Sequence, residues 1–226
     1  MKSRSNKRRF LQDHGLTLVL LFLCIASLVG HAITGWHVWN EDRVTHGEVA
    51  QDLVVYLWSG AFQESVAENW ESEFLQMLCF VWFATFLYQR GSPESKEPGK
   101  EDPSEADPRA APMQADTPWP VKKGGLPLKL YEHSLVIAFL LLFLGSFIWH
   151  IFGGVAFHNE ERARMGEPLL TAVDYIAGPD FWFESFQNWQ SEFLSVAAMV
   201  FFSVYLRQRG SPESKPVATP HAEHGD

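Results

Sequence analysis

Histidine and glutamate recur as a matched pair in the two halves of this sequence. His31 and His150 lie 119 residues apart, and so do Glu73 and Glu192. A histidine beside a carboxylate can hold a proton, relay it, or bind a metal ion such as zinc, iron or manganese. Polar residues accompany both pairs at the same spacing and can add hydrogen bonds to them. These residues are Asn69, Ser72, Asn188 and Ser191.

The spacing of these residues along their helices predicts that they form one layer. His31 follows His14 by 17 residues, and Glu73 precedes Arg90 by the same number. At 1.5 Å per residue, 17 residues of helix rise about 25 Å. If His14 and Arg90 both mark an inner membrane boundary, His31 and Glu73 lie at one height near the outer boundary. The second half repeats this spacing, so the layer contains two histidines and two glutamates.

Three interpretations of this polar layer remain open at the level of sequence. In the first, each histidine hydrogen-bonds a glutamate and locks a helical hairpin. In the second, the layer carries ions or protons across a helical bundle. In the third, two histidines and two carboxylates bind a metal ion, although the Glu-x-x-His pairing of carboxylate-bridged di-iron bundles is absent. We adopt the structural interpretation, and therefore expect no metal site and no cofactor.

Four uncharged blocks must position this layer. Lys, Arg, Asp and Glu are all absent from residues 14–40, 74–89, 133–159 and 193–206. A helix needs about 20 apolar residues to cross a bilayer, and the first and third blocks meet that length unaided. The second and fourth blocks are shorter, so their helices must begin earlier, near Asn69 and Asn188. The expected fold class is all-α and integral to the membrane, with four transmembrane helices.

Composition and charge exclude several classes of protein. The chain has 226 residues, 46% of them hydrophobic, and a formal net charge of −9. The uncharged blocks exclude a simple soluble enzyme and a wholly disordered or collagen-like chain. The negative charge excludes a nucleic-acid binder driven by bulk charge. No nucleophile with an orienting base, glycine-rich phosphate loop or haem attachment motif is recognisable, so we expect no enzymatic activity and no catalytic residues.

The distribution of basic residues predicts the orientation in the membrane. Of the 18 Lys and Arg residues, 15 lie in the N-terminal segment, the central linker and the tail. The positive-inside rule then predicts both termini and the linker in the cytoplasm. A cleaved signal peptide is the alternative for the first block, but its apolar run exceeds the usual length of a signal sequence. The expected location is the inner (cytoplasmic) membrane, crossed several times.

An internal repeat organises the chain. With an offset of 119, residues 14–96 align without gaps on residues 133–215, and the eight residues QRGSPESK end both copies identically. This pattern predicts two helical hairpins in the same orientation, each ended by a glycine cap and a proline within QRGSPESK. The expected divisions are a basic N-terminus at 1–13, a first transmembrane hairpin at 14–92, a disordered cytoplasmic linker at 93–128, a second transmembrane hairpin at 129–211 and a cytoplasmic tail at 212–226.

The N-E-x-R turn, the N-W-E-S-E-F-L-Q segment at residues 69–76 and the Q-R-G-S-x-E-S-K ending resemble a bacterial family of small integral membrane proteins of unknown function. The resemblance covers both hairpins. The second copy departs from it at Gln190 and Ser195, which replace Glu71 and Gln76. This resemblance implies the same topology and supplies no activity or cofactor.

These observations lead to one expected function and one alternative. We expect a non-enzymatic structural, assembly or stress-related component of the bacterial cytoplasmic membrane. The alternative is a small ion, proton or metal transporter or channel that uses the polar layer. The expected partners are the lipid bilayer and either further copies of the chain or other membrane proteins, with no nucleic acid.

Overall fold

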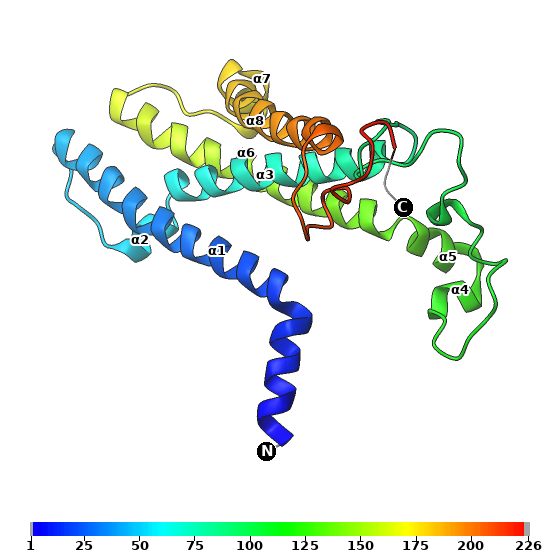
Figure 1. Ribbon diagram of the computed structural model, residues 1–226. Coiled ribbons are helices and arrows are strands. Elements are labelled where there is room, and N and C mark those ends of the chain that lie inside the picture. Colours follow the sequence, from blue (N-terminus) through cyan, green and yellow to red (C-terminus); the bar gives the residue numbers. More distant parts are fainter. Residues whose placement is uncertain (1, 224–226) are drawn as a thin grey trace. The chain divides into compact units, whose positions relative to one another are not determined.

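The computed structural model describes the backbone of residues 2–223 and the side chains of residues 9–223, and every regular element in that range is helical (Figure 1). The expectation of an all-α chain is therefore confirmed. The helices are α1 (Lys2–Thr45), α2 (Leu53–Leu57), α3 (Gly60–Phe83), α4 (Trp119–Lys123), α5 (Gly125–Glu132), α6 (Ser134–Met165), α7 (Ala172–Ala177) and α8 (Pro179–Tyr205), with a 3-10 turn η1 at Pro103–Glu105.

Two helices of the described chain are long and apolar enough to cross a membrane. They are the segment Arg9–Thr45 of α1 and the whole of α6. The expectation of four such helices is not supported. Any long window of α3 contains several glutamates, and α8 carries the polar segment 187–192 in its middle.

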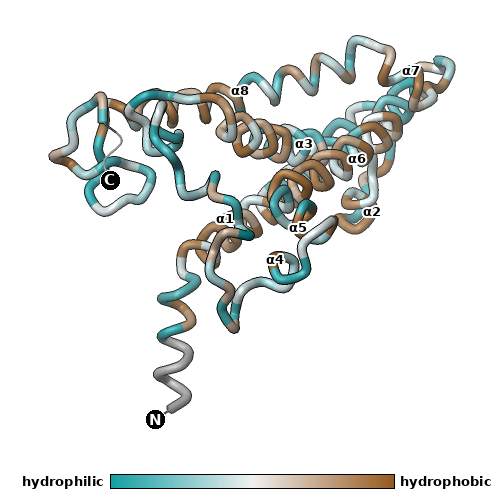
Figure 2. Tube along the Cα trace, turned by 90° about the vertical axis from the view of Figure 1, so that its right-hand side faces the viewer, coloured by the Kyte–Doolittle hydropathy of each residue, from teal (hydrophilic) through white to brown (hydrophobic). Residues whose placement is uncertain are grey.

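The surfaces of the two apolar helices are exposed to a large extent. Figure 2 shows apolar residues along both α1 and α6. Leu16 and Phe22 of α1 and Leu141 of α6 are between 64% and 75% exposed. A core helix of a soluble protein buries such side chains, so α1 and α6 are not covered as core helices by the rest of this chain.

The helices α3 and α8 end before the repeated QRGSPESK motif rather than within it. The backbone leaves α3 through tighter turns, in which the Phe86 amide donates to the Phe83 carbonyl at 3.1 Å. After α8, the Arg207 guanidinium donates to the carbonyls of Ser203 and Val204, at 3.3 and 3.0 Å. This cation satisfies carbonyls that the helix end leaves without partners. The expected glycine caps inside the motif are therefore not what ends these helices.

The two QRGSPESK motifs instead form the same separate turn. The Gln89 amide donates to Ser95 Oγ at 2.7 Å, and the Gln208 amide donates to Ser214 Oγ at 2.8 Å. The central glycines have φ angles of +82° and +88°, a left-handed conformation that favours glycine. Identical local sequence thus forms an identical hydrogen-bonded turn. The central linker at 93–128, expected to be disordered, contains η1, α4 and the first residues of α5 within otherwise irregular chain.

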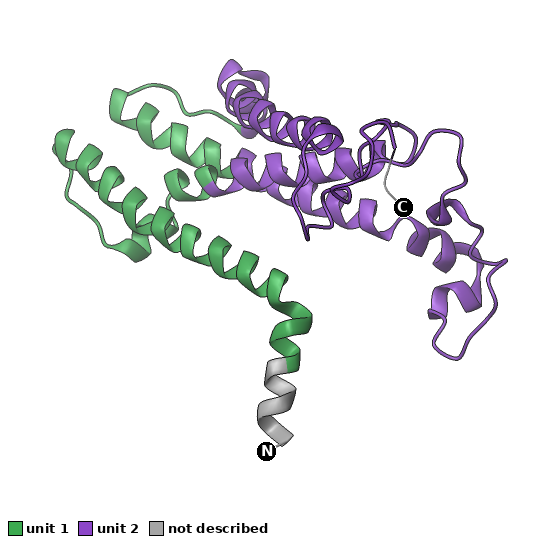
Figure 3. Cartoon of the chain, viewed as in Figure 1, with its two compact units in different colours: residues 1–65, 152–171 green, residues 66–151, 172–226 purple. Residues whose placement is uncertain are grey.

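The chain divides into two compact units, each built from both halves of the sequence (Figure 3). Unit 1 comprises residues 1–65 and 152–171. Unit 2 comprises residues 66–151 and 172–226. The unit boundaries therefore do not coincide with the boundaries of the two predicted hairpins.

Glycines allow helices to approach each other closely inside unit 1. A Cβ on Gly60 of α3 would lie 2.2 Å from the Phe157 amide nitrogen of α6, and a Cβ on Gly153 would lie 2.7 Å from the Glu64 amide nitrogen. Neither distance is compatible with a side chain, so these residues let the start of α3 and the end of α6 pack backbone to backbone. On α1, Gly35 leaves the space that the Tyr56 hydroxyl occupies.

Candidate functional site: two histidine clusters

A buried histidine between two glutamates is the central feature of unit 2. His150 lies on α6 and has no exposed surface. Its Nδ1 lies 2.6 Å from Glu71 Oε2, and its Nε2 lies 3.4 Å from Glu184 Oε2. Glu71 is also fully buried, and its Oε1 accepts a hydrogen bond from the Trp189 indole at 3.0 Å. Side chains of α3, α6 and α8 are thereby joined.

Two aromatic residues complete this group of side chains. The Tyr175 hydroxyl donates to Glu184 and lies 3.5 Å from His150 Nε2. The Phe181 ring is fully buried, and its centroid lies 4.9 Å from that of the His150 ring. The short helix α7 and the start of α8 at Pro179 bring both residues to the histidine. We call the six residues the His150 cluster: His150, Glu71, Tyr175, Phe181, Glu184 and Trp189.

The contacts of His150 determine what the cluster can hold. A neutral imidazole has one donor and one acceptor nitrogen, whereas carboxylates only accept. Both carboxylate contacts are hydrogen bonds only when the cluster holds one extra proton, on the ring or on a carboxyl group. A metal ion on a ring nitrogen would replace the hydrogen bond of that nitrogen to its carboxylate. The arrangement therefore suits a shared proton and a fixed link between helices.

Unit 1 contains a similar cluster at the corresponding positions. His31 Nε2 lies 3.1 Å from Ser65 Oγ. The ring centroid of Phe62 lies 5.7 Å from that of His31 and 5.4 Å from that of Tyr56. We call these four residues the His31 cluster. Each of them lies 119 residues before a member of the His150 cluster, and the chemical difference is Ser65 in place of Glu184.

The histidines of the predicted polar layer have partners other than those expected. His150 contacts Glu71 and Glu184 rather than Glu192, and His31 contacts Ser65 rather than Glu73. The reason is the helical period. Glu73 follows Glu71 by two residues, which rotates its side chain by about 200° around α3.

The other predicted layer residues lie in unit 2, outside these two histidine clusters. Glu73 and Glu192 lie close enough to repel each other electrostatically. Asn188 of α8 hydrogen-bonds Glu68 and donates to the Glu184 carbonyl at 3.1 Å. The hydroxyls of the two serines donate to the carbonyls of the two asparagines within their own helices, each at 2.8 Å. These pairs are Ser72 with Asn69 and Ser191 with Asn188.

Sequence reasoning missed Glu71 and Glu184, although a signal for them was present. Both are positions at which the repeat changes chemistry: Gln190 corresponds to Glu71, and Ser65 corresponds to Glu184. The predicted layer was built from residues that are identical in the two copies of the repeat. The partners of His150 lie at positions where the two copies differ. A search for acidic residues unique to one copy would have found both.

Comparison with known proteins places the chain in a family. Residues 7–226 match the family described as a domain of unknown function, DUF6766. The chain belongs to the DUF6766 family. No curated protein and no solved structure matched it. Functional inference for this DUF6766 protein therefore depends on its geometry.

The DUF6766 chain also has a network of ion pairs in unit 1, where α1 and α6 end. Arg43 of α1 lies 2.8 Å from Glu48 and 3.0 Å from Glu160 of α6. Arg164 of α6 lies 2.7 Å from Asp42, 2.8 Å from Glu48 and 3.0 Å from Glu160. The side chains of Arg43 and Arg164 are only 16% and 20% exposed, so solvent screens these pairs less than it screens fully exposed ones.

The turns that follow α1 and α6 are closed in the same way. The Asn40 side chain accepts a hydrogen bond from the Gln51 amide at 2.8 Å and donates to the Gln51 carbonyl at 2.9 Å. The Asn159 side chain makes the corresponding pair with Leu170, at 2.7 and 2.9 Å. Arginine contacts add to both turns, because Arg43 donates to the Val49 carbonyl and Arg162 to the Pro168 carbonyl. The N-E-x-R motif thus determines a specific turn.

Proposed function

We propose that this DUF6766 protein is a non-enzymatic structural or assembly component of the bacterial cytoplasmic membrane. The observation that carries this proposal is that the histidine of the His150 cluster is buried and both of its ring nitrogens are engaged. His150 and Glu71 have no exposed surface, and each ring nitrogen of His150 faces a carboxylate. Such a group links helices and offers no open position to a substrate.

Membrane location is supported by the exposed apolar surfaces of α1 and α6. In the four-span arrangement that we propose, α3 and α8 complete two hairpins, and the His150 cluster satisfies polar groups that would otherwise contact lipid. A polar group without a hydrogen-bond partner costs several kcal/mol in hydrocarbon. The polar side chains of these helices therefore need partners within the protein. The basic residues favour cytoplasmic termini.

Duplication of one helical hairpin is the proposed origin of the architecture. The offset of 119 relates the QRGSPESK turns, the asparagine-closed turns and the histidine clusters. In each case the same hydrogen bonds or ring contacts recur at corresponding residues. The difference between Ser65 and Glu184 then represents divergence after duplication.

A double-substitution experiment tests the structural role of the His150 cluster. Removing one partner of a buried charged pair leaves the other uncompensated and costs about 3–5 kcal/mol, whereas replacing both with apolar groups is often neutral. We expect Glu71→Leu to lower the melting temperature of the full chain in detergent. Adding His150→Leu should recover much of that loss.

Glu73→Leu is the matched control for this experiment. It makes the same substitution two residues away on the same helix, at a side chain that is exposed and that Glu192 repels. We expect it to leave the melting temperature unchanged or to raise it slightly. Equal losses for the two single variants, with no recovery in the double variant, would contradict the structural role.

A proton or cation carrier is the second candidate function. The observation that favours it is the placement of His150 between carboxylates of two different helices, where a proton can move from one to the other. Flux into proteoliposomes that carry a pH-sensitive dye distinguishes the candidates. We expect no flux above that of empty liposomes. Flux that Glu184→Gln abolishes, or stoichiometric metal in elemental analysis, would replace the structural proposal by this one.

A further inference from the structure

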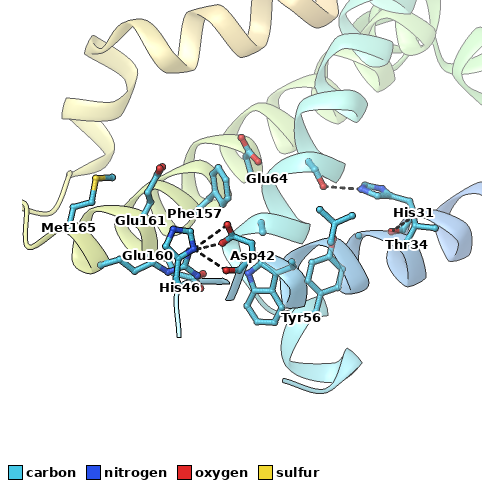
Figure 4. Close-up of a pocket in the computed structure, with 16 residues that line it drawn as sticks. His31, Thr34, Asp42, His46, Tyr56, Glu64, Phe157, Glu160, Glu161 and Met165 are labelled. Atoms are coloured by element: carbon cyan, nitrogen blue, oxygen red, sulfur yellow. Dashed lines mark hydrogen bonds and ion pairs between the residues drawn. The ribbon is translucent and has the colours of Figure 1, made fainter. Parts of the chain in front are cut away.

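Unit 1 contains a cavity of about 770 Å³, and His31, Tyr56 and Ser65 of the His31 cluster form part of its lining. Its lining comes from α1, α2, the start of α3 and the end of α6, as Figure 4 shows. Cavities of 300–1,000 Å³ are typical of sites for small organic molecules. The volume therefore suits a ligand much larger than a single metal ion.

Aromatic and apolar side chains form part of the lining of this cavity. Trp39, Tyr56 and Phe157 line it, together with Val38 and Met165. Trp39 and Tyr56 are buried and pack against each other, with ring centroids 5.5 Å apart. Rings held in this way have fixed π faces, which attract cations as well as apolar groups. Arg43 already lies over the Trp39 ring, 4.8 Å from its centroid, so a bound cation would use the remaining ring faces.

Acidic side chains also line the cavity. Four carboxylates line it, whereas Arg164 is its single lysine or arginine. Arg164 is already engaged by Asp42 and Glu160 within the ion-pair network. Glu161 is exposed and forms no ion pair with any residue whose side chain the structure describes. The cavity therefore has an excess of negative charge, and Glu161 is available to a ligand.

We propose that this cavity binds an organic cation with an aromatic or apolar body. The body would lie against Trp39, Tyr56 and Phe157, and the positive group would lie towards Glu161. The acidic lining disfavours an anion, and a bare metal ion would leave most of the volume unfilled. This inference does not depend on the structural role proposed for the His150 cluster, which lies in unit 2.

Two probes of the same shape and opposite charge test this inference. Tetraphenylphosphonium is an aromatic cation, and tetraphenylborate is the corresponding anion. We expect the full-length protein in neutral detergent to bind tetraphenylphosphonium, as measured by calorimetry and by quenching of tryptophan fluorescence. Binding of tetraphenylborate should be much weaker. Higher salt concentration should weaken the binding of the cation, because it screens the exposed carboxylate.

Three variants locate the bound probe. Glu161→Gln should weaken tetraphenylphosphonium binding by about tenfold, which corresponds to the loss of one charge interaction. Val38→Trp fills the cavity at a side chain that is 67% exposed, so the fold should tolerate it while binding is lost. Glu41→Gln is the matched control, because Glu41 lies on α1 outside the cavity lining. It should leave the affinity unchanged.

Several outcomes would overturn the inference. Equal affinity for the two probes would identify the cavity as an apolar slot, suited to a lipid chain rather than to a cation. Unchanged affinity in both Glu161→Gln and Val38→Trp would mean that the probe binds elsewhere on the protein or in the detergent micelle. Absence of tetraphenylphosphonium binding to the wild type would reject the site directly.

Discussion

Glu94 and Glu213 hydrogen-bond each other through their side chains, although they occupy the same position in two identical motifs. The two QRGSPESK turns therefore meet within unit 2. Burial raises the pKa of Glu94 to about 7, and the hydrogen bond and negative charge of Glu213 add to this rise. Two carboxyl groups that hydrogen-bond each other favour sharing one proton.

The shared proton predicts that stability falls as pH rises. The folded chain holds the Glu94 proton up to about pH 7, whereas the unfolded chain loses it near its ordinary value of 4.5. Since the folded state binds more protons between these values, the stabilisation is complete below pH 4.5 and is lost as pH rises through about 7. The melting temperature measured from pH 5 to pH 8 should reveal this slope. Glu94→Gln should flatten it, and the exposed control Glu101→Gln should not.

Replacing Glu184 by serine should convert the His150 cluster towards the composition of the His31 cluster. Glu184→Ser removes the acceptor of the Tyr175 hydroxyl and one of the two carboxylates that face His150. Leaving a buried donor without a partner costs about 1–3 kcal/mol, so the melting temperature should fall. Ser65→Ala, which removes one neutral contact of His31, should cost less. Equal losses in thermal denaturation would mean that the carboxylate has no special role.

The asparagines that close the two turns of unit 1 should contribute similarly to stability. Asn40→Ala and Asn159→Ala each remove two hydrogen bonds to the backbone. At about 1 kcal/mol for each bond, each variant should lose about 2 kcal/mol. Thermal denaturation of the full chain measures this loss. Gln187→Ala, at an exposed side chain of α8, serves as the control, and a loss as large as that of the asparagine variants would contradict the interpretation.

Cysteine labelling distinguishes four membrane spans from two. In a background that lacks Cys24 and Cys79, single cysteines replace the exposed residues Val49 and Ala110. If α3 crosses the membrane, the two positions lie on opposite sides and label from opposite sides of sealed vesicles. If only α1 and α6 cross, both positions lie on one side. We expect opposite sides, because basic residues are concentrated in the linker and rare in the loop after α1.

Local patterns of the sequence were sufficient to predict the helical class and the recurrence of the two motifs, although not the turn that QRGSPESK forms. The uncharged blocks around residues 14–40 and 133–159 correspond to the two apolar helices α1 and α6. Their hydrophobicity is a property of consecutive residues and needs no tertiary information. The hydrogen bonds that close the N-E-x-R and QRGSPESK turns are also local, because they join residues no more than 11 positions apart.

The partners of the histidines were decided by tertiary structure. Counting residues from the predicted membrane boundary gave the depth of His150 in the membrane but not the direction in which its side chain points. Either Glu71 or Glu192, on another helix, could therefore have been its partner. The rotation of α3 and α8 about their own axes decides that Glu71 and Glu184 face the histidine. That rotation depends on how the helices pack, and packing involves residues 34 to 79 positions away from His150. Sequence alone therefore determined which residue types carry chemistry here, whereas the packed helices determined which of them meet.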